Sequence, residues 1–120
     1  MGKKIVHVEF PAAEGDRGEK FWTELAGWSF NDVGMPDIDY RMFDGGGGWG
    51  GAIWTSEELA GKGPIIYLDS DDIDADVARV RELGGEAEDK QPIPNIGWFA
   101  RCRDTEGNAF SLYQSDENAA

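Results

Sequence analysis

The chain has 120 residues, and its 24 Asp and Glu against 11 Lys and Arg give a net charge of −13 at pH 7. A surface this negative repels phosphate backbones and anionic lipids, so neither a nucleic acid nor a membrane surface is expected as a partner. The charge balance favours a cationic ligand, although many acidic proteins share it. The length predicts one domain, near the size at which association with a second copy adds useful burial.

Cysteine content and hydropathy predict the cellular compartment. Cys102 is the only cysteine, so no intrachain disulfide can form and a reducing environment is expected. The segment after Lys3 and Lys4 is too short and too polar for a signal peptide, and no run approaches the ~18 apolar residues of a membrane-spanning helix. We therefore expect a cytoplasmic protein, in which Cys102 is a small buried apolar residue and not a nucleophile.

The first predicted element is a strand. Residues 4–10 alternate in polarity, with His7 and Glu9 on one face, which is typical of a half-buried strand. Pro11 is expected to end this strand, because proline has no backbone N–H to donate.

The second predicted element is a helix over residues 16–26. Asp16 stands at the N-cap position, Glu19 completes a capping box three residues later, and Gly27 supplies the C-terminal stop. The apolar stripe of this helix consists of Phe21, Trp22 and Leu25.

Three strands complete the first half of the chain. They are predicted at residues 28–33, 37–43 and 52–55, with a turn at 34–36. Which face of the strand at 37–43 points inward is left open. The run 45–51 is glycine except for Trp49. It lacks the Lys-Ser/Thr ending and the following helix of a phosphate-binding loop, so a flexible hairpin connection is the better interpretation.

The same order of elements recurs after a linker at residues 56–63. The predicted elements are a strand at 65–68, a helix capped by Asp71 or Asp72 and stopped by Gly84, an edge strand at 86–91, a turn at 92–94, and a hairpin of 97–102 and 109–114 around a turn at 104–108. At an offset of 58 residues, Val8 falls on Ile66 and Gly27 falls on Gly85. This spacing predicts an internal duplication.

The doubled strand–helix–strand–strand–strand plan resembles the vicinal oxygen chelate superfamily, which includes glyoxalases, bleomycin and fosfomycin resistance proteins and extradiol dioxygenases. Three segments carry the likeness. They are Ile5-Val6-His7-Val8-Glu9-Phe10, Leu25-Ala26-Gly27-Trp28 and Asp104-Thr105-Glu106-Gly107-Asn108, the last being similar to the family's Asp-Pro-Asp-Gly-Asn turn.

The resemblance covers residues 4–114 and implies an α+β fold. Two βαβββ modules, at 4–55 and 64–114, are expected to form curved mixed sheets with helices outside and a concave ligand cup. Residues 1–114 would then be one glyoxalase/bleomycin resistance-like domain, followed by a disordered tail at 115–120. A superfamily that hosts many chemistries implies a fold much more strongly than a function.

The resemblance also implies where a metal ion would bind. In metal-dependent members, His, Gln or Glu side chains at four strand positions hold a divalent ion. Those positions fall here on His7, Ile65, Ser111 and close to Gly51. Only His7 is a good ligand, so we expect neither a metal nor another cofactor. An unusual site that uses Glu9 or Asp69 stays open.

Strand alternation and the resemblance predict which side chains line the cup. The expected ligand-binding residues are His7, Glu9, Tyr67, Asp69, Ser111 and Tyr113 by alternation, Phe99 and Arg101 by resemblance, and Trp49 and Trp54 at the rim. Aromatic walls with a few fixed polar groups suit a small-molecule pocket. Two alternatives stay open, namely contact of His7 with Glu9 or a backbone carbonyl, and pairing of Arg101 with Glu9 or Asp69. The remaining tryptophans, Trp22, Trp28 and Trp98, are expected in the core.

Two hypotheses for function follow. The first is a metal-free binding protein of the bleomycin-resistance type, which holds an aromatic or cationic small molecule and assembles as a homodimer. The second is a glyoxalase-like lyase or isomerase, with a degenerate metal site or with acid–base chemistry by His7 and Glu9. Whether any catalysis occurs, and on what substrate, is not encoded in a readable motif.

Overall fold

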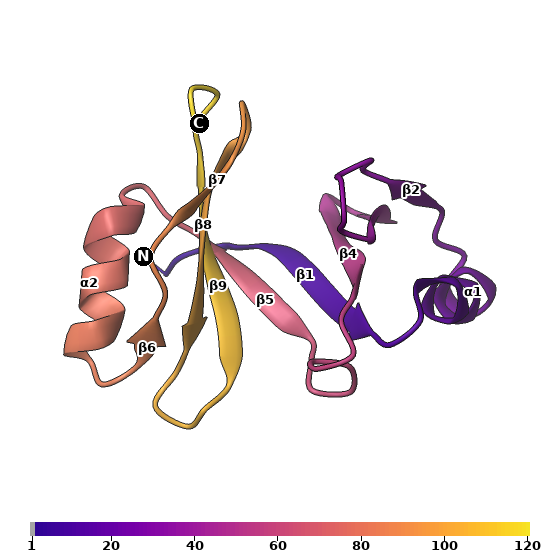
Figure 1. Cartoon of the computed structure of the whole chain (residues 1–120), viewed down its shortest axis with the longest axis horizontal. Coiled ribbons are helices and arrows are strands. Elements are labelled where there is room, and N and C mark those ends of the chain that lie inside the picture. Colours follow the sequence, from indigo (N-terminus) through magenta and orange to yellow (C-terminus); the bar gives the residue numbers. More distant parts are fainter. Residues whose placement is uncertain (1) are drawn as a thin grey trace. The chain divides into compact units, whose positions relative to one another are not determined.

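The computed structural model describes residues 2–120, which divide into two compact units. One unit is His7–Ile65, and the other combines the residues before His7 with Ile66–Ala120. Each unit contains one helix and a set of mixed strands in a βαβββ-like order (Figure 1). The predicted α+β class and the two βαβββ modules are confirmed.

The first unit is built on four strands in the order β2-β3-β4-β1. Strand β4 pairs in parallel with β1 and forms an antiparallel hairpin with β3, which pairs in turn with β2. The elements are β1 (Ile5–Ala12), α1 (Gly15–Ala26), β2 (Phe30–Asp32), β3 (Tyr40–Gly46) and β4 (Trp49–Thr55).

The second unit has the strand order β5-β9-β8, and β6 and β7 both pair with β8. Strands β5 and β9 are parallel, whereas β8 and β9 are the two arms of the predicted hairpin. The elements are β5 (Ile65–Asp69), α2 (Ile73–Glu82), β6 (Glu86–Ala87), β7 (Gln91–Ile93), β8 (Gly97–Arg103) and β9 (Ala109–Ser115).

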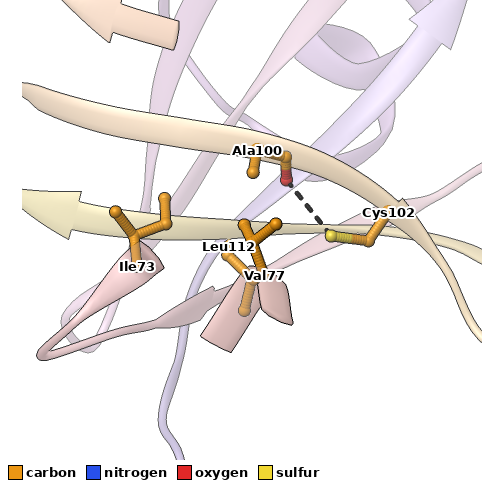
Figure 2. Close-up of a cluster of buried hydrophobic side chains, with 5 residues drawn as sticks. All are labelled: Ile73, Val77, Ala100, Cys102 and Leu112. Carbon is orange, nitrogen blue, oxygen red and sulfur yellow. Dashed lines mark hydrogen bonds between the residues drawn. The ribbon is translucent and has the colours of Figure 1, made fainter. Parts of the chain in front are cut away.

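Helix α2 covers one face of the second sheet. Asp72 caps the helix by accepting a hydrogen bond from the Ala75 N–H at 3.1 Å, so of the two predicted caps the structure selects Asp72. The core beneath the helix consists of Ile73, Val77, Ala100, Cys102 and Leu112 (Figure 2). Burial raises the pKa of the Cys102 thiol to about 11, which agrees with its prediction as an inert apolar residue.

An aromatic cluster joins helix α1 to its own sheet. The ring of Trp22 lies 4.9 Å from that of Phe10 and 5.2 Å from that of Trp28, and Trp28 stacks on Phe43 at 4.2 Å between centroids. Trp22 and Trp28 are therefore core residues, as predicted. Offset stacking of this kind adds to the hydrophobic stabilisation of the contact.

The predicted start of helix α1 is wrong. The helix begins at Gly15 after Glu14, and Asp16 lies in the first turn, where its carboxylate binds Arg41 at 2.9 Å and caps nothing. The predicted stop at Gly27 is correct, since Gly27 adopts φ 75° and donates its N–H to the Thr23 carbonyl. Two residues of the predicted apolar stripe, Phe21 and Leu25, are 57% and 68% exposed.

Several predicted strand limits also need correction. Strand β1 continues through Pro11, because β1 and β4 are parallel and Pro11 lies near the strand end, where a missing N–H is tolerated. The strand predicted at 28–33 is limited to β2, and the one predicted at 37–43 is displaced to β3. The edge strand predicted at 86–91 is divided into β6 and β7.

The glycine-rich run forms the predicted hairpin, and most of it belongs to the two strands. Gly50 and Gly51 belong to β4, and only two glycines separate β3 from β4. A Cβ on Gly51 would lie 1.9 Å from the Val8 carbonyl oxygen, and one on Gly50 would lie 2.6 Å from that of Phe43. Glycine is required at these positions because two backbones approach too closely for any side chain.

The end of the chain is folded back. Ser115 still belongs to β9, and the buried Ala119 accepts a hydrogen bond from the Asn95 N–H at 3.0 Å. The last residues form a turn through these contacts, and the disorder expected there stays a prediction. Between residues 2 and 120, no helix is long and apolar enough to cross a membrane.

Candidate functional site

All candidate site residues except Trp49 lie on the sheet face opposite their own unit's helix, which we call the helix-distal face. In the first unit, Phe10 and Ile53 contact α1, so the residues of opposite alternation are helix-distal. Register then assigns the helix-distal face to His7, Glu9, Tyr40, Met42, Ala52 and Trp54. This face includes His7 and Glu9 together, as the alternation of residues 4–10 predicts.

His7 forms a pair with a residue that sequence reasoning missed. Its Nε2 lies 2.8 Å from the Oη of Tyr40, and the two rings are nearly parallel, with 12° between their planes. Burial lowers the pKa of His7 below 6.5, so its imidazole is neutral at pH 7. The alternation of Tyr40 with Met42 was the available signal, but it could not say which face of the strand points inward.

Glu9 is the most deeply buried ionisable residue of this face. Only 1% of its surface is exposed, and it lies level with Ala52 of β4 and Met42 of β3. Removing a carboxyl group from water costs free energy, so a buried Glu9 lowers the stability of the fold unless other contacts compensate. Such a group is more typical of a functional site than of a core.

In the second unit, six predicted residues lie on the helix-distal face in two rows. Ser111 of β9 lies between Tyr67 of β5 and Arg101 of β8, and Tyr113 lies between Asp69 and Phe99. The Arg101 guanidinium lies 5.6 Å from the ring centre of Phe99, which is within the range of a cation–π contact. Alternation within β5 and β9 predicted four of these residues, and the family resemblance predicted Phe99 and Arg101.

The two predicted rim tryptophans do not share a face. Trp54 is paired with Tyr40 on the helix-distal face. Trp49 lies five positions before Trp54 along β4, which is an odd offset. Since side chains alternate along a strand, Trp49 points to the other side of the sheet. Its ring is half exposed at the end of the β3–β4 hairpin.

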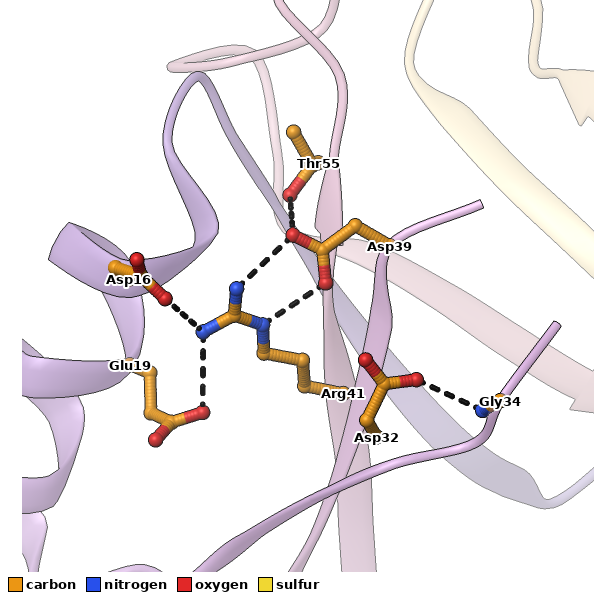
Figure 3. A network of polar contacts seen from close by, with 7 residues as sticks. All are labelled: Asp16, Glu19, Asp32, Gly34, Asp39, Arg41 and Thr55. Carbon is orange, nitrogen blue, oxygen red and sulfur yellow. Dashed lines mark hydrogen bonds and ion pairs between the residues drawn. The ribbon is translucent and has the colours of Figure 1, made fainter. Parts of the chain in front are cut away.

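A second polar cluster lies on the opposite side of the first sheet. Arg41 binds Asp39 through two hydrogen bonds of 2.9 and 3.0 Å, and it also binds Asp16 and Glu19 of α1 (Figure 3). Asp39 accepts a further bond from the Thr55 hydroxyl at 2.9 Å. Because these groups attach the start of α1 to β3 and β4, the cluster has a structural role.

Comparison with known families decides the identity of the fold. The model of the glyoxalase-like domain family matches residues 6–113. The chain belongs to this family. It is a glyoxalase-like domain of the vicinal oxygen chelate superfamily, as its doubled βαβββ plan predicts.

The relatives of this glyoxalase-like domain include a glyoxylase-like domain-containing protein of Didymella fabae, which is 27% identical over 117 residues and 91% of each chain. Among solved structures, methylmalonyl-CoA epimerase of Mycobacterium tuberculosis matches 93% of this chain and 87% of its own at 16% identity, with a TM-score of 0.72. A hypothetical protein of Bacillus halodurans matches 100% and 99% at 14% identity, with a TM-score of 0.74.

A third solved structure contains a ligand. The methylmalonyl-CoA epimerase of Streptomyces coelicolor, in complex with 2-nitronate-propionyl-CoA, matches 98% of both chains at 17% identity with a TM-score of 0.67. At such low identities these three structures establish the fold of the glyoxalase-like domain, and they say nothing further about its activity.

The superfamily's metal positions do not fit a metal ion in this glyoxalase-like domain. Ile65 has no donor atom, Ser111 is a poor ligand, and at Gly51 the Val8 carbonyl leaves no room for a side chain. His7 directs its Nε2 at Tyr40. In the part of the chain that the structure describes, no three His, Cys, Asp or Glu side chains are grouped so that they could hold a metal ion.

Proposed function

We propose that this glyoxalase-like domain is a metal-free small-molecule-binding protein of the bleomycin-resistance type. Its ligand would be a flat aromatic molecule, neutral or cationic, held on the helix-distal face of one unit. The observation that carries the proposal is the loss of three of the four metal-ligand positions, together with the engagement of His7 Nε2 by Tyr40. Without a metal, stacking and hydrogen bonding are the interactions left for holding a ligand.

The side chains of the helix-distal faces support a preference for such a ligand. Aromatic rings are available from Tyr40, Trp54, Tyr67, Phe99 and Tyr113. The first unit contributes the acid Glu9, and the second contributes the acid Asp69 and the cation Arg101, so neither face carries a large fixed charge. Stacking should therefore dominate the affinity, with a modest preference for cations.

Two measurements test the proposal. Elemental analysis of the purified protein should find no stoichiometric zinc, nickel or iron, and a chelator should leave the melting temperature unchanged. A panel of aromatic cations should quench tryptophan fluorescence, and Glu9→Gln should weaken cations more than neutral aromatics. One metal ion per chain, or carboxylate ligands that bind in place of cations and are lost in Arg101→Ala, would refute it.

A glyoxalase-like isomerase or lyase is the second candidate. It is favoured by His7, which is neutral at pH 7 and shares a strand face with the buried acid Glu9. A neutral imidazole can accept a proton from a carbon next to a carbonyl group. Turnover of a 2-oxo or thioester substrate that survives chelation and disappears in His7→Gln would favour this enzyme over the binding protein.

We also propose that the protein is a homodimer. The unit His7–Ile65 exposes large apolar side chains, namely Phe21, Leu25, Val33, Met35, Ile38, Met42 and Trp49. Exposed apolar groups in this number are typical of a contact surface, and a second copy is the simplest partner for it. Sedimentation should show a dimer at tens of micromolar, and a monomer at that concentration would contradict the proposal.

A further inference from the structure

Tyr40 reaches His7 across a whole strand. The two residues belong to β3 and β1, and β4 lies between them. Strands two places apart are separated by roughly 9–10 Å, so the phenol ring has to lean over β4 to place its Oη 2.8 Å from Nε2. The register places Trp54 of β4 opposite Tyr40, and the small side chain of Ala52 lies on the same face two positions nearer the level of His7. The hydrogen bond between Tyr40 and His7 depends on large side chains on β3 and β1 and a small one, Ala52, on β4.

The direction of the hydrogen bond follows from the chemistry of the two groups. Neutral imidazole has one nitrogen that donates and one that accepts, and the pKa of His7 is lowered by burial, which keeps it neutral. A phenol O–H is a stronger donor than an imidazole N–H, and a bare imidazole nitrogen is a stronger acceptor than a phenol oxygen. The favoured bond therefore runs from the Tyr40 O–H to Nε2 of His7, with the proton of His7 on Nδ1.

This direction leaves a defined role for the phenol oxygen. Once its proton is directed at His7, the Oη of Tyr40 can only accept further hydrogen bonds. Both side chains are half-buried on the helix-distal face, so they are neither fully sequestered nor freely solvated. A ligand on this face would meet an oxygen acceptor beside the parallel rings.

We propose that Tyr40 is a positioning and specificity-determining residue, which holds His7 as the neutral Nδ1–H tautomer and accepts a hydrogen bond from a donor group of the ligand. The ligand class is thereby narrowed to aromatic molecules that carry a hydroxyl, an amide N–H or a primary ammonium group. The inference deepens the proposed function and rests on it for ligand recognition, whereas the tautomer of His7 can be tested without a ligand.

The tautomer is measured by nitrogen-15 NMR of the imidazole at pH 7. His7 is the only histidine, so its two nitrogens give an unambiguous pattern. The wild-type protein should show a protonated Nδ1 and a bare Nε2. Tyr40→Phe should shift the proton toward Nε2, and the control Arg79→Ala, at an exposed position of α2, should retain the wild-type pattern. A protonated Nε2 in the wild type, or an unchanged pattern in Tyr40→Phe, would overturn the positioning role.

Recognition is measured with two probes, benzylammonium and benzyltrimethylammonium. Both are aromatic cations, but only the first donates hydrogen bonds. The wild type should bind benzylammonium more tightly than benzyltrimethylammonium, by roughly tenfold or more, as one charge-assisted hydrogen bond predicts. Tyr40→Phe should remove this difference by weakening benzylammonium alone, and the control Arg79→Ala should preserve it.

The outcomes separate the inference from the proposed function. Equal weakening of both probes in Tyr40→Phe would indicate a packing role and would overturn donor recognition. Wild-type protein that binds neither probe would refute aromatic-cation binding, and with it the recognition role of Tyr40, while the NMR result would still decide the positioning role. The melting temperature of Tyr40→Phe is measured first. If it equals that of the wild type, the variant is folded and the NMR and binding comparisons are valid.

Discussion

At the scale of single residues, Arg41 shows how one side chain organises an element boundary. Its guanidinium is only 17% exposed and contacts carboxylates of Asp39, Asp16 and Glu19. A bidentate contact of this kind combines strength with a fixed geometry that a lysine could not reproduce. The start of α1 is thereby attached through a cluster of charges, in place of the capping box that the sequence predicts.

Arg41→Ala is therefore expected to lower the free energy of unfolding by about 1–3 kcal/mol, because Asp39 would keep its partly buried position without its cation. Urea denaturation at pH 7 measures this loss. The matched control is Arg79→Ala, whose ion pair with Glu82 is exposed on both sides and should contribute less than about 0.5 kcal/mol. Similar losses in the two variants would contradict a special role for Arg41.

The same cluster should make stability depend on pH. Hydrogen bonding from Arg41 holds the pKa of Asp39 below its ordinary value of 3.8. Because the pKa is lower in the folded state, the stabilisation is complete above 3.8 and is lost as the pH falls below it. Asp39→Asn should be less stable than the wild type at pH 7, with a difference that shrinks under acid conditions. A difference that does not change with pH would rule out this explanation.

Gly51 shows that the absence of a side chain can be a requirement. Its position in β4 would bring a Cβ to 1.9 Å from the Val8 carbonyl, so Gly51→Ala has to force β1 and β4 apart. We expect a loss of about 3 kcal/mol or more, or failure to fold. At Gly2 an added Cβ would meet no described atom within 4 Å, so Gly2→Ala should leave the melting temperature unchanged. A stable Gly51→Ala would disprove the close approach.

At the scale of elements, each helix covers its sheet in a different way. Helix α2 contributes aliphatic side chains to a core of Ile, Val and Leu, with Asp72 as its cap (Figure 2). Helix α1 stacks Trp22 on an aromatic cluster and leaves Phe21 and Leu25 exposed. The two modules therefore repeat a pattern of elements without repeating the chemistry of their cores.

Leu112 and Leu83 make a matched pair, because the first lies in the α2 core and the second lies outside it. Leu112 of β9 is 2% exposed in the core, whereas Leu83, directly after α2, is 60% exposed. Leu112→Ala should cost about 2–5 kcal/mol through lost burial and the remaining cavity, and Leu83→Ala should cost less than about 0.5 kcal/mol. Thermal and urea denaturation report both values. If Leu83→Ala is as destabilising as Leu112→Ala, Leu83 must be covered in solution, for example by a second copy.

At the scale of the whole molecule, the net charge of −13 opposes the approach of strongly anionic ligands. The ligand seen in one epimerase neighbour is an acyl-CoA analogue, and the CoA group carries several phosphates. A chain with 24 acidic residues opposes such an anion at long range, and stacking contacts on the helix-distal faces offer little to a phosphate.

Acetyl-CoA is accordingly expected to leave the melting temperature unchanged, whereas an aromatic cation should raise it. The affinity for the cation should fall only weakly as salt is added, because stacking dominates and the long-range attraction is screened. Thermal-shift measurements at low and high salt check both statements. Stabilisation by acetyl-CoA would move the protein toward the epimerase-like chemistry of its neighbours.

Much of the architecture could be predicted from the sequence because it depends on local periodicity. Alternation along residues 4–10, 65–68 and 109–114 identified three strands and the faces that carry His7, Glu9 and Ser111. The recurrence of strand, helix and three strands predicted the duplication and, with the closing turn, the superfamily. Both signals can be recognised in a single sequence, because each comes from apolar residues that recur on the buried face of a strand or helix.

What only the tertiary structure decided depends on pairing between distant strands. The bond between His7 and Tyr40 needs the register of β1, β4 and β3 at once, and nothing local to residues 37–43 reveals their inward face. Gly51 looked like part of a loop because its constraint comes from the backbone of Val8, more than 40 residues earlier in the chain. The cap predicted at Asp16 was replaced by a bond to Arg41 for the same reason. Local propensity is weak beside a specific contact, and such contacts exist only once the strands have been brought together.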